Sequence, residues 1–218
     1  MSECFGNQNS EIVFLFLPGW TTPPVSILNF LTHNVNKNKY WCILNQTFKG
    51  NQWFRYGAVE EGSEKNYNSF ISHINLNLKN SNELTESINY ISETIDNINK
   101  KVVLLGTSQG ATAAFHYFHS SFCSEKVMGL WVHNMAGFYP EYLNTSKKYM
   151  YNVYTDTKLN DRHSTFDDDT FDQMNRCLNI ITKNRSKRVF FYNSKNDNVI
   201  PNRFKKMMMN ELFKIYNF

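Results

Sequence analysis

The fold of this 218-residue chain is decided by the stretch Val102-Val-Leu-Leu-Gly-Thr-Ser-Gln-Gly-Ala-Thr-Ala-Ala-Phe115. Its four leading apolar residues indicate a buried strand, and the alanine-rich segment after Gly110 favours a helix. The five residues from Gly106 to Gly110 suit a turn so sharp that only small side chains fit beside it. The sequence therefore predicts a strand–turn–helix unit that lifts Ser108 to the N-terminus of the helix.

Four more short apolar runs predict strands at Ile12–Leu17, Tyr40–Leu44, Val127–Val132 and Val189–Tyr192. Continuous apolar runs are typical of parallel strands that helices cover on both faces. Helical patterns separate most of the runs, most clearly at Leu84, Ile88, Ile91, Ile95 and Ile98. We expect one α/β domain over residues 1–218, with three layers and a mainly parallel sheet of about five strands. Across the sheet the runs should lie in the order second, first, third, fourth, fifth.

The connection at residues 141–186 is longer than one crossover requires, so we expect an insertion there. Within it, helical spacing predicts one helix on the positions Phe171, Met174, Leu178 and Ile181. Long connections at this edge of an α/β sheet often shape the entrance to a substrate site.

Ser108 has the chemical setting of a nucleophile. On a turn of this kind, called a nucleophile elbow, the serine hydroxyl stands above the sheet and backbone N–H groups at the helix N-terminus can stabilise an oxyanion. Gly-x-Ser-x-Gly also occurs in ordinary glycine-rich turns. The strand before it and the helix after it favour the catalytic interpretation, that of a serine hydrolase.

Several segments resemble the acyl-protein thioesterase and carboxylesterase (phospholipase/carboxylesterase) family of the α/β-hydrolase fold. Ser108-Gln-Gly110 is similar to the elbow of that family, and Asp197-Asn-Val-Ile-Pro201 is similar to the segment with its catalytic acid. Leu17-Pro-Gly-Trp20 resembles its first oxyanion loop, and Trp53-Phe54 resembles a pair that follows its next strand.

The resemblance implies hydrolysis of carboxylic esters or thioesters through an acyl-enzyme on Ser108. Asp197 would orient and support a histidine base, and the backbone N–H groups of Trp20 and Gln109 would form the oxyanion hole. The Trp53-Phe54 region would line the acyl or alcohol pocket. Pro18 departs from the histidine usual in the family, but an oxyanion hole requires only the backbone.

The triad histidine of this fold follows the acid, on a loop after one further strand. No histidine follows Asp197 here, and His133 ends the predicted fourth strand on the wrong connection. Three explanations are open. The last strand and its histidine belong to a segment outside this sequence, or an internal residue such as His163 supplies the base, or the protein is a pseudo-hydrolase that acts as a binding or interaction module. A missing strand would leave an unpaired sheet edge beside the strand that precedes Asp197.

The formal net charge is +4, and the densest basic cluster is Lys183, Arg185, Lys187 and Arg188. This cluster has no interleaved aromatic side chains, so we expect a solvated loop and no nucleic-acid partner. The expected partner is a small-molecule or acylated-protein substrate with an ester or thioester bond.

The cysteines are widely spaced, with no Cys-x-x-Cys pair and no histidine at metal-binding spacing: Cys4, Cys42, Cys123 and Cys177. We therefore expect reduced thiols, no metal site and no cofactor. The longest early apolar run, Ile12–Leu17, is too short for a signal-peptide core or a membrane span. These features predict a soluble, cytoplasmic protein without stable membrane insertion.

Overall fold

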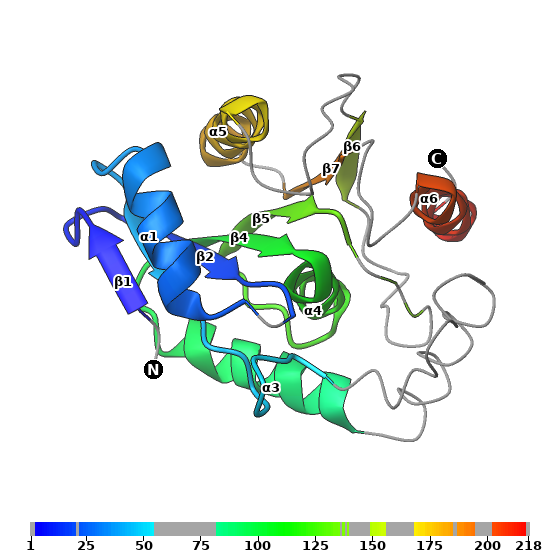
Figure 1. Ribbon diagram of the computed structural model, residues 1–218, viewed down its shortest axis with the longest axis horizontal. Coiled ribbons are helices and arrows are strands. Elements are labelled where there is room, and N and C mark those ends of the chain that lie inside the picture. The colour runs from blue at the N-terminus through cyan, green and yellow to red at the C-terminus, as the bar shows by residue number, and fades with distance from the viewer. Residues whose placement is uncertain are drawn as a thin grey trace.

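The computed structural model describes residues 3–20, 22–54, 82–135, 137, 139, 149–155, 168–184, 187–194 and 202–216. In these residues a seven-stranded sheet has the order β1-β3-β2-β4-β5-β7-β6 (Figure 1). The strands are β1 (Glu3–Gly6), β2 (Ile12–Leu17), β3 (Tyr40–Ile43), β4 (Lys101–Thr107), β5 (Val127–His133), β6 (Met150–Thr155) and β7 (Arg188–Asn193). β1 is antiparallel to β3, and the other neighbouring pairs are parallel.

The five predicted runs are β2, β3, β4, β5 and β7, and the predicted order across the sheet is confirmed. The expected count of about five strands is too low, because β1 and β6 lie at the two edges. Edge strands face solvent, so they lack the continuous apolar run of a central strand. In β6, for example, Met150 and Val153 are 50% and 40% exposed.

β6 occupies the place beyond β7. Met150–Thr155 pairs in parallel register with Arg188–Asn193. The explanation that the last strand is missing predicted an unpaired edge beside the strand that precedes Asp197. That prediction is wrong, because a strand from the predicted insertion pairs with β7 there.

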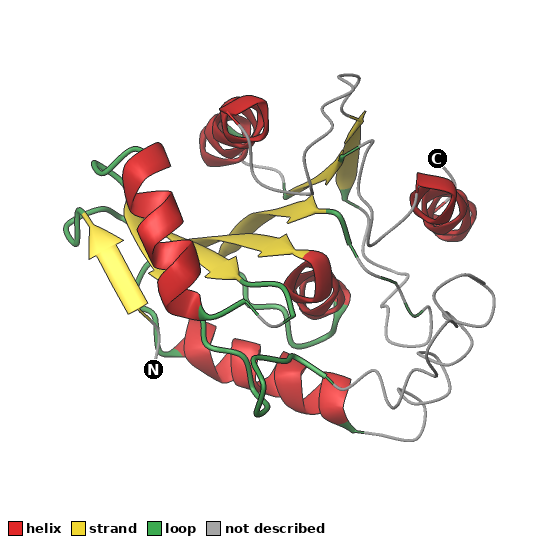
Figure 2. Ribbon diagram, viewed as in Figure 1, coloured by secondary structure: helices red, strands yellow, loops and turns green. Residues whose placement is uncertain are grey.

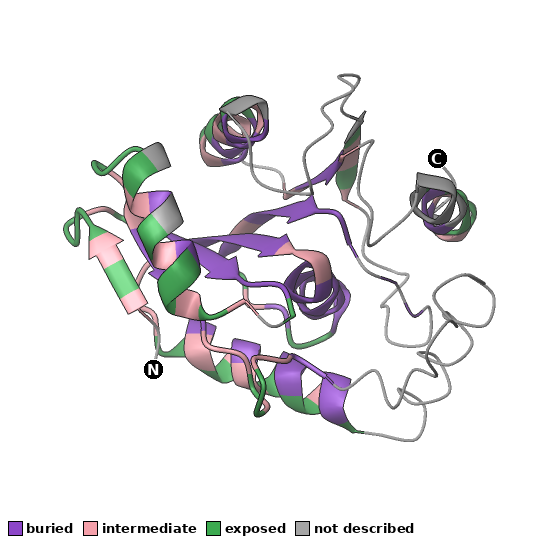
Figure 3. Cartoon of the chain, in the orientation of Figure 1, coloured by how far each residue is buried: buried purple, intermediate pink, exposed green. Residues whose placement is uncertain are grey.

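Helices cover both faces of the sheet (Figure 2). They are α1 (Pro24–Asn34), α3 (Glu83–Asp96), α4 (Ser108–His119), α5 (Asp168–Lys183) and α6 (Asn202–Tyr216). Side chains of α3, α4 and α6 pack on one face and those of α1 and α5 on the other, which is the predicted three-layer arrangement. Figure 3 shows α4 and the central strands as the most buried elements.

The predicted apolar stripes are present. Leu84, Ile88, Ile91 and Ile95 are buried along α3, while Ile98 lies just beyond its end and is partly buried. On α5 the buried positions include all four that the spacing predicted: Phe171, Met174, Leu178 and Ile181. Each stripe packs a helix on the sheet, as expected for a 3.6-residue period.

The cysteines differ from the expectation. Cys4 of β1 and Cys42 of β3 are directly opposed in register and form a disulfide, whereas Cys123 and Cys177 are buried and are not part of a disulfide. Reduced thiols were therefore the wrong prediction for Cys4 and Cys42, since β1 brings together two residues that are 38 positions apart. Desolvation raises the pKa of Cys177 to about 12, which keeps its thiol protonated.

Among the helices in the described part of the chain, none has both the length and the apolar character to cross a membrane.

Candidate active site

Ser108 lies in the turn between β4 and α4. Thr107 ends the strand with extended backbone (φ −124°, ψ 143°), and Ser108 begins the helix with a φ of 51°. This left-handed conformation costs a residue with a side chain roughly 1–2 kcal/mol, so the surrounding structure must hold it in place. The predicted strand–turn–helix unit is thus present, with a strained serine at its apex.

Two glycines allow the loop after β2 to cross the start of α4. A Cβ on Gly110 would overlap the carbonyl oxygens of Leu17 and Pro18. A Cβ on Gly19 would lie 3.2 Å from the Cβ of Ser108. The Leu17–Trp20 loop therefore packs directly on the Ser108 turn.

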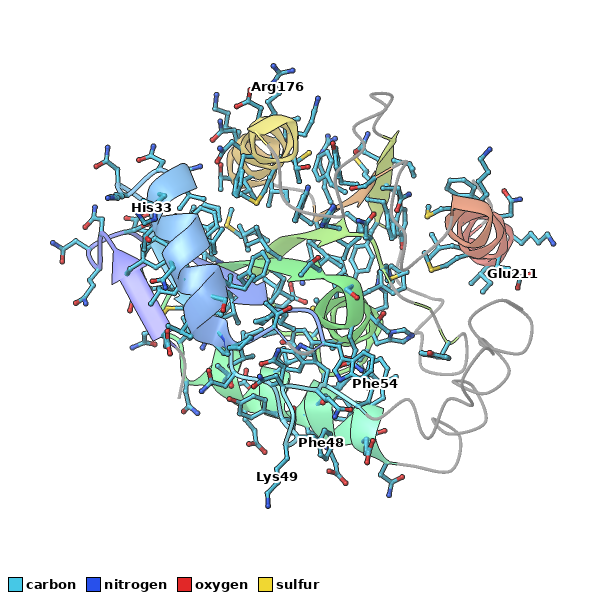
Figure 4. All side chains as sticks on the ribbon, viewed as in Figure 1. His33, Phe48, Lys49, Phe54, Arg176 and Glu211 are labelled. Atoms are coloured by element: carbon cyan, nitrogen blue, oxygen red, sulfur yellow. A yellow bond between two sulfur atoms is a disulfide. The ribbon has the colours of Figure 1, made fainter. Side chains whose placement is uncertain are left out.

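The Gln109 side chain holds a second loop behind this turn. It is fully buried, its Oε1 accepts the Trp53 backbone N–H at 2.8 Å, and its Nε2 donates to Phe54 O at 2.6 Å. The Trp53 indole N–H in turn donates to Pro18 O at 2.7 Å. Figure 4 shows Phe54 beside α4. Trp53 and Phe54 are themselves fully buried, so they support the loop from behind and do not line an open pocket.

The peptide between Gly19 and Trp20 is fixed by a side chain. Gln46 Nε2 donates to Gly19 O and to Thr22 O, each at 2.9 Å. In a trans peptide the C=O and N–H point in opposite directions, and the described chain has no cis peptide. The Trp20 N–H is therefore directed away from Gln46. The Trp20 side chain is 48% exposed.

Asp197 and His163 lie outside the described residues. The approach to Asp197 is described as far as Ser194, the residue after β7. β4, β5 and β7 are adjacent and parallel. Ser108 and Ser194 therefore leave the sheet at the same edge, two strand spacings or about 10 Å apart.

A cluster of polar side chains lies between these two positions, and the sequence did not reveal it as part of the site. It contains Thr107, His133, Asn134 and Ser194, which share hydrogen bonds at the carboxyl ends of β4, β5 and β7. The available signal was the His133-Asn134 pair directly after an apolar run. A strand position alone does not reveal which neighbours the ring contacts.

Two histidines on α4 are committed to packing. His116 Nδ1 bonds Thr112 O at 2.7 Å, and its Nε2 accepts the Tyr139 N–H at 2.9 Å. His119 Nδ1 bonds Phe115 O and its Nε2 bonds the Tyr151 hydroxyl, both at 2.8 Å. Both rings are fully buried, so neither offers a nitrogen to a substrate.

Within the described ranges, no three His, Cys, Asp or Glu side chains gather in a way that could hold a metal ion.

Solved structures share this architecture at low sequence identity. A phospholipase/carboxylesterase from Dyadobacter fermentans aligns over 97% of this chain and 95% of its own, with a TM-score of 0.50 and 12% identity. Acyl-protein thioesterase 2 from Zea mays aligns over 99% of each chain, with a TM-score of 0.50 and 10% identity. No protein-family model and no curated protein sequence matches this chain. The likeness establishes a shared α/β fold.

Proposed function

We propose that the protein is a serine hydrolase that cleaves carboxylic esters or thioesters through an acyl-enzyme on Ser108. The observation that carries the proposal is the left-handed backbone of Ser108, with the Gly19 loop packed against its Cβ. Backbone strain is found mainly at functional sites, because it costs free energy that an ordinary turn avoids. The substrate classes agree with the names of the two similar structures, a phospholipase/carboxylesterase and an acyl-protein thioesterase.

In this reaction Ser108 Oγ attacks the acyl carbonyl while a base removes the hydroxyl proton. The alcohol or thiol leaves with that proton, and water then releases the acid from Ser108. The N–H groups of Trp20 and Gln109 would hold the oxyanion. Gln109 lies in the first turn of α4, where backbone N–H groups have no partner within the helix. One such donor contributes roughly 3–4 kcal/mol to the transition state.

His163, oriented by Asp197, is the base we propose. β6 lies beside β7 and runs parallel to it, so its end at Thr155 is at the same edge as Ser108. His163 follows Thr155 by eight residues, a chain that reaches at most about 27 Å. Three strand spacings, about 14 Å, separate β6 from β4. The internal strand β6 therefore supports the explanation in which an internal histidine replaces the one expected after Asp197.

The substrate would be a small-molecule or acylated-protein ester or thioester. The half-exposed Trp20 follows Gly19, which packs on Ser108. An exposed indole ring at this place offers an apolar surface to the acyl or alcohol part of a substrate.

Labelling with a fluorophosphonate probe tests the proposal, because the probe reacts with an activated serine. We expect the wild-type protein to be labelled and Ser108→Ala to abolish labelling. Ser26→Ala, which changes an exposed serine on α1, should label like the wild type. A folded wild-type protein that is never labelled would contradict the proposal and favour the alternative, a pseudo-hydrolase that acts as a binding or interaction module.

A further inference from the structure

One buried imidazole ring connects three strand ends at the edge of the sheet that holds Ser108. His133 is paired in register with Thr107 on β4 and with Tyr192 on β7. Its Nδ1 lies 3.2 Å from Thr107 Oγ1, and its Nε2 lies 3.0 Å from Ser194 Oγ. The residue is 1% exposed, and its ring stacks on Trp131 with an interplanar angle of 13°. Packing thus fixes the plane of the ring, and both nitrogens have partners.

Asn134 determines the direction of these hydrogen bonds. Its Oδ1 accepts the Ser194 N–H at 2.8 Å, which assigns the two ends of the amide. The amide Nδ2 then lies 3.1 Å from His133 Nε2 and 3.2 Å from Ser194 Oγ. Because an amide nitrogen only donates, His133 Nε2 is assigned as the acceptor, and in the neutral form of the ring the proton then lies on Nδ1, toward Thr107 Oγ1.

The backbone of Asn134 is adapted to this contact. It has a left-handed φ of 48°, a conformation that asparagine tolerates better than most residues. Its own N–H donates to Tyr192 O at 3.0 Å, so main chain and side chain both hold the end of β7.

We propose that His133 is a positioning residue, which fixes the Ser108 turn relative to the segment leading to Asp197. Thr107 directly precedes Ser108, and Ser194 lies three residues before Asp197. The group of Thr107, His133, Asn134 and Ser194 is called the His133 clasp below. The inference rests on the proposed function, since it states how the proposed nucleophile and acid are held at their working distance.

An apolar side chain would fill the same space as His133, but it would not fix the hydroxyl groups on either side. A fully satisfied buried polar network specifies one geometry, because any other arrangement leaves a polar group without a partner. Catalysis is sensitive to such geometry: a misplacement of 1 Å can cost about 100-fold in rate.

Conservative variants at the two ends of the clasp test its role. Hydrolysis of p-nitrophenyl butyrate would be measured for Thr107→Val, Ser194→Ala and the double variant, each with His133 and with His133→Ala. We expect each single variant to lower kcat about tenfold with little change in KM. With His133→Ala present, Thr107→Val should lower kcat no further, because its hydroxyl acts through the ring. Ser194→Ala should have a smaller effect than it has with His133, since Ser194 Oγ also bonds Asn134 Nδ2.

His119→Phe is the matched control, since His119 is equally buried and bonds the Tyr151 hydroxyl away from the clasp. It should lower the melting temperature and leave kcat unchanged. The proposal is overturned if Thr107→Val and Ser194→Ala leave kcat unaltered, or if their effects remain in full with His133→Ala. Fluorophosphonate labelling of the wild type reports separately on the proposed function. If labelling is retained while the clasp variants behave like the wild type, only the positioning role fails.

Discussion

Ser108 depends on neighbours that lack a side chain. A Cβ on Gly106 would lie 2.7 Å from the Cα of Ala111, so the strand and the helix meet with no space between them. The sequence could predict this local geometry, because small residues on both sides of a serine allow few backbone arrangements. It could not predict that Gln109 bonds Trp53 and Phe54, since contacts across 56 and 55 positions depend on the folded chain.

His116 makes stability depend on pH on the acid side. Desolvation by burial lowers its pKa from 6.5 to about 4, although its bond to Thr112 O acts in the opposite direction. The unfolded chain takes up a proton near pH 6.5, whereas the folded protein does so only near pH 4. The free energy of unfolding therefore falls as the pH drops from 6.5 to 4, by about 3 kcal/mol in total.

His116→Gln should remove this part of the pH dependence. We expect the free energy of unfolding in urea to change less for the variant than for the wild type between pH 6.5 and pH 4.5. The comparison cancels other groups that titrate in the same range. His33→Gln, on the exposed side of α1, should follow the wild-type curve. Parallel curves for His116→Gln and the wild type would show that burial does not keep His116 neutral.

Two kinds of element could be predicted from the sequence: strands that are buried on both faces, and helices that bury one apolar stripe. The central strands are continuous apolar runs, and α3 and α5 show apolar residues at helical spacing. β6 escaped prediction because its sequence, Met150-Tyr-Asn-Val-Tyr-Thr155, mixes exposed and half-buried positions. The same strand pairs with β7 and so occupies the edge that was expected to be free.

Because β6 ends at the same edge of the sheet as Ser108, it supports a prediction about His163 as the catalytic base. His163→Ala should lower kcat for p-nitrophenyl butyrate as far as Ser108→Ala does, because serine without a base is a weak nucleophile. Removal of one triad member leaves only ~10³–10⁴-fold catalysis over water. Added imidazole should restore part of the activity of His163→Ala and none of that of Ser108→Ala. His33→Ala should remain fully active.

An unchanged kcat for His163→Ala would exclude this residue as the base. The explanation in which a segment outside this sequence supplies the strand and histidine would then be tested by adding such a segment.

At the scale of the whole molecule, the disulfide fixes one edge of the sheet. Cys4 and Cys42 join β1 to β3 across a separation of 38 residues. In the chain-entropy model, closure of a loop of this length stabilises the folded state by about 3–4 kcal/mol. The sequence alone did not indicate this bond, because it depends on the register of a short edge strand.

Cys4→Ala/Cys42→Ala should lower the melting temperature by about 10 °C, given roughly 2–4 °C per kcal/mol for a chain of this size. A reducing agent should produce a similar shift in the wild type and none in the double variant. Hydrolysis at 20 °C should be unaffected, because the disulfide lies on β3 and β1, beyond β2 from the Ser108 turn. Equal melting temperatures in the presence and absence of reductant would show that the bond does not form.

The position of β7 has a consequence for how the protein is made. β7 lies between β5 and β6, although both precede it in the chain. During synthesis, the edges of β5 and β6 that pair with β7 therefore remain exposed until residue 193 has left the ribosome. Such unpaired edges are where nascent chains aggregate or engage chaperones. Ser194 directly follows β7 and bonds His133, so β7, the last of the described strands to be synthesised, completes both the described sheet and the His133 clasp.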